Sequence, residues 1–109
     1  MKVEMKILLL CHDLTTRMRL EATWTAQGVR MLPKNSGETA DCIVVDLGRN
    51  DALQEISRLR ALHPDLTIIA CAASFEEGAV EAAKDAGATD FAARGFVDRR
   101  VARLLKLPG

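Results

Sequence analysis

Cys42-Ile43-Val44-Val45-Asp46 is an unbroken apolar run that ends in a carboxylate. A run of this kind, rich in β-branched residues, is typical of a parallel strand that is covered on both faces of its sheet. In an open α/β sheet, functional groups are concentrated at the carboxyl ends of such strands. Asp46 is therefore the first candidate for a functional residue.

Strand-like and helix-like segments alternate on both sides of this run. Strands are predicted over 5–10, 29–32, 66–71 and 89–93, where apolar and β-branched residues dominate. Helices are predicted over 14–27, 51–62, 74–87 and 96–106, where apolar residues recur every three or four positions. This alternation predicts an α/β fold with a doubly wound, five-stranded parallel sheet, in a single domain over residues 1–109.

Local signals define the predicted helix ends. Asp13 or Thr15 can cap the helix that begins at Leu14, and Gly28 can end it. Ser74, with Glu77 three positions later, has the spacing of a capping box, and Gly87 follows as a terminator. These signals predict that the third of the four helices begins at Ser74.

The helical periodicity also predicts which side chains face the sheet. Inward positions in the two helices over 51–62 and 96–106 are Leu53, Ile56, Leu59 and Leu62, and Val97, Val101, Leu104 and Leu105. Trp24 is one of only four aromatic residues in the chain, and we expect it to pack in the core.

The connection after Pro33 departs from the alternating pattern. Residues 34–40 are polar and contain Asn35-Ser36-Gly37, a turn sequence. A crossover between parallel strands ordinarily needs about ten or more residues of helix. The second crossover helix is therefore predicted to be shortened or absent, which leaves one flank of the sheet thinly covered.

Composition excludes several classes of function. Fifteen basic residues balance fifteen acidic ones without a concentrated patch, so neither a nucleic-acid surface nor a membrane anchor is indicated. The start of the chain has no export signal, and we expect a cytoplasmic protein. The three cysteines lack the spacing of a zinc site or a disulfide framework and are interpreted as buried small residues. Leu107-Pro108-Gly109 fits either a natural end or a linker.

Taken together, these segments resemble the receiver domains of response regulators, the CheY-like family. The resemblance spans nearly the whole chain and is most specific at Ala86-Gly87-Ala88-Thr89-Asp90-Phe91, which matches the family's Ala-Gly-Ala-Asp-Asp-Tyr/Phe pattern. Leu59 to Leu66 resembles the helix exit that follows the phosphoacceptor strand. The resemblance implies a flavodoxin-like sheet with strand order 2-1-3-4-5 and a role in bacterial two-component signalling.

The resemblance also implies roles for residues of the acidic pocket. Asp46 stands at the phosphoacceptor position. The two acidic residues with which the family binds magnesium fall on Cys11 and His12, and Asp13 lies one position beyond them. Thiol and imidazole are poor magnesium ligands, so the acidic pocket is interpreted as degenerate.

The positions that respond to phosphorylation are altered as well. The family's hydroxyl residue falls on Ala72, and its lysine falls on Arg94, which is followed by Gly95 instead of proline. Phe91 stands at the aromatic switch position without its hydroxyl partner. Alanine cannot hydrogen-bond a phosphoryl oxygen, and arginine lacks the compact point charge of lysine. Asp46 remains as a strand-end carboxylate that could pair with Arg94.

Three hypotheses on function follow. The first is a pseudo-receiver, a phosphorylation-independent module that binds a protein partner without any cofactor. The second is a receiver that is still phosphorylated on Asp46, with magnesium held in part by Asp13. The third is a thiol or metal sensor that uses Cys11 and His12. Adjacent residues on a strand point to opposite faces, so Cys11 and His12 are not expected to act as a catalytic pair, and no enzyme activity is predicted.

The partner of this domain is expected to bind the face formed by the helix over 74–87, the strand over 89–93 and the last helix. This is the contact face in the family that the chain resembles. Glu76, Glu77 and Glu81 on one helix and Arg99, Arg100 and Arg103 on the other give the face both signs of charge. Such a face can complement its own copy across a two-fold axis, so the sequence leaves a homodimer open.

Overall fold

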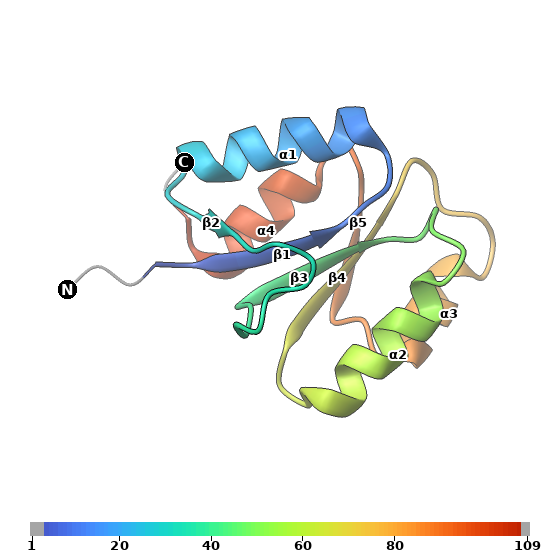
Figure 1. Cartoon of the computed structure of the whole chain (residues 1–109). Helices are drawn as coiled ribbons and strands as arrows, with labels where there is room; N and C mark the ends of the chain where they lie inside the picture. The colour runs from blue at the N-terminus through green and yellow to red at the C-terminus, as the bar shows by residue number, and fades with distance from the viewer. Residues whose placement is uncertain (1–3, 108–109) are drawn as a thin grey trace.

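The computed structural model describes residues 4–107, and residues 1–3 and 108–109 lie outside the described part. The chain alternates strands and helices in the expected order (Figure 1). The elements are β1 (Lys6–Leu10), α1 (Leu14–Ala26), β2 (Arg30–Met31), β3 (Cys42–Asp46), α2 (Ala52–Leu62), β4 (Thr67–Ala72), α3 (Ala79–Ala86), β5 (Asp90–Ala93) and α4 (Val97–Leu105). The interpretation of Leu107-Pro108-Gly109 falls largely on residues that are not described.

The strands form one parallel sheet of order β2-β1-β3-β4-β5, as predicted. β3 lies at the centre, and every one of its residues is buried. The connection from β2 to β3 contains turns and bends but no helix among the described residues, which confirms that the second crossover helix is absent. As a result, the structure has four helices within residues 4–107.

Helices cover both faces of the sheet. α1 and α4 lie on one face, and α2 and α3 lie on the other (Figure 1). Each layer has its own apolar core: Trp24, Leu20 and Val101 are fully buried on the first face, and Ile56 and Ile68 on the second. The prediction that Trp24 packs in the core is confirmed.

The predicted start of the third helix is wrong. Ser74 lies in a bend, and α3 begins five residues later, at Ala79, after a turn at Glu77 and Gly78. Gly78 has φ +83°, a left-handed conformation that an α-helix does not contain. Phe75 packs edge-on against Phe91 with 5.7 Å between ring centroids. This tertiary contact is made by a segment that belongs to no helix or strand, and it competes with the local capping signal.

Three of the predicted inward leucines are exposed. Leu53, Leu62 and Leu104 have 42%, 60% and 42% of their surface accessible. In α2 the predicted inward residues Ile56 and Leu59 are buried, and Ala52 joins them on the same face, at intervals of four and three residues. The helix is therefore rotated toward small Ala52, which lets its axis approach the sheet. No helix in the described part of the chain has the length and apolar character needed to cross a membrane.

A test of the fold lies at Gly87, the residue that ends α3. Arg60 of α2 donates from Nε to the Gly87 carbonyl (2.9 Å) and from Nη2 to Thr89 Oγ1 (3.0 Å). Gly87 has φ +123°, and a Cβ placed on it would lie 2.7 Å from Cβ and Cγ of Arg60. Gly28 has φ +87° with no atom within 4 Å of such a Cβ. Both glycines therefore have a positive φ that disfavours other residues, but only at Gly87 would an added Cβ also collide with a neighbouring side chain.

We predict that Gly28→Ala lowers the free energy of unfolding by about 1 kcal/mol, through backbone strain alone. Gly87→Ala should lower it by about 3 kcal/mol, because strain and the contact with Arg60 add. Urea denaturation of the two variants measures both values. Equal losses would contradict the packing of Arg60 against Gly87.

Candidate functional site

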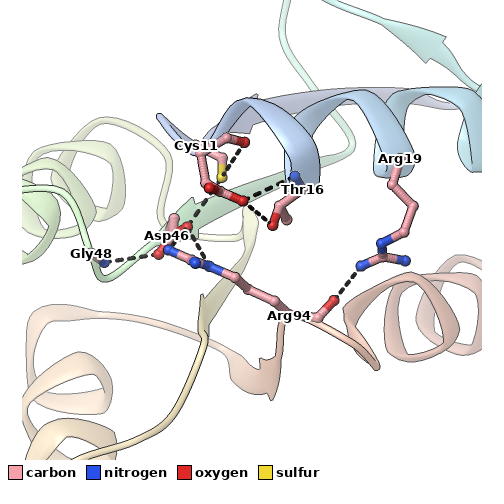
Figure 2. Close-up of polar contacts among 7 residues, drawn as sticks. Cys11, Thr16, Arg19, Asp46, Gly48 and Arg94 are labelled. Atoms are coloured by element: carbon pink, nitrogen blue, oxygen red, sulfur yellow. Dashed lines mark hydrogen bonds and ion pairs between the residues drawn. The ribbon is translucent and has the colours of Figure 1, made fainter.

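Asp46 lies at the carboxyl edge of the sheet, where β1, β3 and β5 bring several polar side chains together (Figure 2). Asp46 is fully buried (0% exposed), and in the parallel pairing of β3 with β4 it lies opposite Cys71. A carboxylate in such surroundings must be hydrogen-bonded or neutralised, because transfer of an unpaired charge out of water is costly. The contacts of Asp46 therefore determine what this site can do.

Both carboxylate oxygens of Asp46 are engaged by this chain. Arg94 donates to Oδ2 from Nε (2.9 Å) and approaches the same oxygen with Nη2 (2.7 Å). The thiol of Cys11 also donates to Oδ2 (3.1 Å), and the backbone N–H of Gly48 donates to Oδ1 (2.8 Å). The pairing of Asp46 with Arg94 that the sequence left open is therefore present, and the charge of Asp46 is compensated by a guanidinium.

The position of Arg94 is fixed by hydrogen bonds of its backbone to other residues. Its N–H donates to the carbonyl of Ala72 (2.9 Å), and its carbonyl accepts a hydrogen bond from Arg19 Nη2 of α1 (2.5 Å). Burial lowers the pKa of the Arg94 guanidinium, but the charge of Asp46 and their hydrogen bond outweigh it and raise the pKa above its usual value. Arg94 therefore stays charged opposite Asp46.

Cys11 is a hydrogen-bond donor in this site and not a reactive thiolate. The residue is 6% exposed, and burial, aided by the hydrogen bond to Asp46, raises the pKa of its thiol to about 11. Burial likewise raises the pKa values of Cys42 and Cys71 to about 12. At neutral pH all three are protonated thiols, which are weak nucleophiles and weak metal ligands.

Asp13 and His12 lie beside the site but do not complete it. Asp13 is the N-cap of α1: its Oδ2 accepts hydrogen bonds from the N–H (3.0 Å) and the hydroxyl (2.5 Å) of Thr16, which lower its pKa. His12 is exposed, and its Cε1 lies near Gly48. Neither side chain contacts Asp46 in the described part of the chain.

The residues present do not fit a magnesium ion of the kind that the receiver resemblance implies. Magnesium requires hard oxygen ligands in octahedral geometry. The position beside Asp46 is taken by the Cys11 thiol and the Arg94 guanidinium, while Asp13 caps a helix. Within residues 4–107, no group of three or more His, Cys, Asp or Glu side chains is arranged to hold a metal.

Ala72 and Phe91 both lie in strands of the sheet, although Ala72 was expected to follow its strand. Ala72 ends β4, is 7% exposed and contributes only its carbonyl, which accepts the Arg94 N–H. Phe91 on β5 is half-buried between Phe75 and Lys84, whose ammonium lies 5.1 Å from the ring centroid. Phe91 is therefore held by neighbours on the α3 side of the sheet.

Sequence reasoning missed three participants in this site: Gly48, Arg19 and the donor role of Cys11. A Cβ on Gly48 would lie 3.1 Å from Arg94 Nη2 and 3.2 Å from Asp46 Oδ1, so the turn approaches the ion pair closely. A glycine two residues after a buried aspartate is a signal that could have indicated this contact. Arg19 donates to a backbone carbonyl that is 75 residues away in the sequence, a contact that no local pattern reveals.

No family model and no curated protein matches the sequence. Similar solved structures include a CheY-like receiver domain protein from Methanospirillum hungatei JF-1, with a TM-score of 0.82, 14% identity, and coverage of 95% of this chain and 92% of that chain. A putative response regulator from Chloroflexus aurantiacus J-10-fl has a TM-score of 0.81 and 22% identity, with coverage of 95% and 96%.

The chain has the fold of a response regulator receiver domain. A third structure with this fold is a response regulator from Burkholderia pseudomallei with a phosphorylated aspartic acid, a calcium ion and citrate. It has a TM-score of 0.78 and 20% identity, and the match covers 91% of this chain and 65% of that chain. The receiver fold suggested by the sequence resemblance is therefore confirmed.

The ion pair of this receiver-like domain can be tested by a double-mutant cycle. Arg94→Ala leaves a buried carboxylate with only Cys11 and Gly48 as donors, so we predict a loss of about 2–4 kcal/mol in the free energy of unfolding. Asp46→Asn keeps the size of the side chain and should cost about 1–2 kcal/mol. The double variant should lose clearly less than the two losses combined.

Chemical denaturation of the three variants gives the coupling energy. Glu38→Gln provides a control, because Glu38 forms a bidentate pair with Arg30 (2.6 Å) on the exposed surface, where the effect should be smaller. Strictly additive losses for the Asp46 and Arg94 variants would show that the buried pair does not contribute to stability.

Proposed function

We propose that this domain is a pseudo-receiver, a signalling module that binds a protein partner without being phosphorylated. One observation supports the proposal most directly: Asp46 is fully buried, with one oxygen bound by Arg94 and Cys11 and the other by Gly48. A nucleophilic carboxylate needs an oxygen free to attack the phosphoryl donor, and a cation placed to neutralise the incoming charge. Here the available cation is a side chain that already neutralises Asp46.

Phosphorylation of Asp46 is the alternative. It would require Arg94 to leave Oδ2 and Asp13 to leave the N-terminus of α1, where it bonds Thr16. Both moves expose unpaired polar groups in a partly buried site, and Ala72 offers no hydroxyl to the phosphoryl group. The proposal therefore assigns Asp46 a structural role, as the buried partner of Arg94, and not the role of a phosphoryl acceptor.

The thiol or metal sensor is a weaker candidate for this site. The Cys11 side chain is turned toward Asp46, to which it donates, whereas His12 is exposed. With a pKa of about 11, the Cys11 thiol has little of the thiolate form that oxidants and soft metals require.

We place the partner contact on the face formed by α3, β5 and α4, and the protein in the cytoplasm, with no nucleic acid or membrane bound by this domain. Phe96 at the start of α4 is 59% exposed and is overlaid by Arg99, with 5.8 Å between the guanidinium and the ring centroid. Arg100 bonds Asp90 of the same chain (3.0 Å), so fewer charges of this face are free than the sequence suggested. A homodimer through this face stays part of the proposal.

The proposal predicts that magnesium with beryllofluoride, a phosphoryl mimic, leaves the protein unchanged. The measurement is the ¹H–¹⁵N spectrum, with the Gly48 amide as the reporter because it bonds Asp46 directly. We expect no shift of this signal at millimolar magnesium. A saturable shift of Gly48 that requires both magnesium and beryllofluoride would overturn the proposal.

A matched control restores the chemistry that the receiver resemblance implies. The variant carries Cys11→Asp, His12→Asp, Ala72→Thr and Arg94→Lys on the same backbone. We expect it to respond to magnesium and beryllofluoride, because two carboxylates, a hydroxyl and a lysine would then occupy the positions that the receiver resemblance assigns to them. Circular dichroism of this variant establishes that it is folded before the titration.

A further inference from the structure

A cavity lies beside the ion pair of Asp46 and Arg94, on the flank of the sheet that the absent crossover helix leaves open. The cavity has a volume of about 540 Å³ and lies at the carboxyl end of β1. Four separate segments contribute polar side chains to its lining: His12 after β1, Arg17 and Glu21 on α1, Lys34 after β2, and Arg49 between β3 and α2. Neither Asp46 nor Arg94 lines the cavity, but Cys11, which donates to Asp46, does, so the cavity borders the buried ion pair.

The polar lining is dominated by cations. Arg17, Lys34 and Arg49 line the cavity together with one carboxylate, that of Glu21, while the carboxylate of Asp51 pairs with Arg49 from outside the lining. Such an excess of positive charge in a concave site attracts anions, because the surrounding protein screens the charges less than water does.

Much of the donor capacity of these cations is unused. Within residues 4–107, Lys34 has no hydrogen bond or ion pair. Arg17 bonds Glu21 only through Nε (3.2 Å), which leaves both of its terminal nitrogens free. Arg49 uses Nε and Nη2 on Asp51 and keeps Nη1. These free N–H groups belong to guanidinium and ammonium groups, which bind phosphate oxygens well.

The remaining wall of the cavity is formed by the Cys11 thiol and by four apolar residues, Leu9, Leu10, Leu32 and Pro33. A volume of about 540 Å³ is within the range of small-molecule sites, which combine apolar walls with a few directed polar groups. An inorganic anion would use only the cations. We propose that this cavity reversibly binds a small organic phosphate of about nucleotide size, with its phosphates on Lys34, Arg17 and Arg49 and its organic part on the apolar wall.

The test is a ¹H–¹⁵N titration of the full chain with ADP and, separately, with pyrophosphate. EDTA is present throughout, so that a metal-dependent reaction at Asp46 cannot contribute and failure here is independent of the proposed function. We expect saturable shifts at His12, Arg17, Lys34 and Arg49, with ADP binding at least about five-fold more tightly than pyrophosphate. Absence of shifts at millimolar ADP, or equal affinity for the two probes, would overturn the proposal.

A matched pair of variants separates a site from general attraction. Lys34→Gln removes a cation from the cavity, and Arg103→Gln removes an exposed cation from α4, outside it. We expect Lys34→Gln to weaken ADP binding by about five-fold or more, and Arg103→Gln by less than about two-fold. Equal weakening by the two substitutions would show non-specific charge attraction and contradict the proposed site.

Discussion

The ion pair of Asp46 with Arg94 is the interaction on which the rest of the site depends. Asp46 is at the end of the central strand and has no exposed surface, so its charge must be compensated from within the chain. Arg94 supplies that charge with two nitrogens of its guanidinium on the same oxygen. The Cys11 thiol and the Gly48 N–H satisfy lone pairs that would otherwise lie unpaired in the interior.

The same interaction links elements that are distant in sequence. Arg94 follows β5 and reaches across β4 to the end of β3, while its carbonyl is bound by Arg19 on α1. The loop between β5 and α4 is therefore anchored to the centre of the sheet and to the helix layer above it (Figure 2). The carboxylate of Asp46 therefore joins the end of β3 to the segment after β5 at the carboxyl edge of the sheet.

The fold could be predicted from the sequence because its signals are local and repeated. The apolar run at 42–46, the glycines that end α1 and α3, and the seven polar residues at 34–40 each define an element or its absence. The start of α3 could not be predicted, because the packing of Phe75 on Phe91 competes with a capping signal. The prediction for Leu53 and Leu62 was wrong because leucines lie on several sides of α2. Their spacing does not show that the buried face is the one that includes Ala52.

The site was only partly predictable for a related reason. The sequence indicated that Asp46 and Arg94 could meet, because Arg94 falls on the lysine position of the receiver family that the chain resembles. The sequence indicated that Asp13 could cap α1, as it does, but it did not show that Cys11 donates to the carboxylate. The role of Cys11 depends on the direction of its side chain at the exit of β1, where one residue of shift changes which face a side chain occupies.

The most direct test of the ion pair is the exchange of the Arg94 Nε–H proton with water, followed by NMR in ¹⁵N-labelled protein. Nε donates to a fully buried carboxylate, so we predict that its exchange is at least about ten-fold slower than that of Arg103, which is exposed on α4. The protection should disappear in Asp46→Asn. Exchange of the Arg94 proton as fast as that of Arg103 would contradict the claim that Arg94 neutralises Asp46.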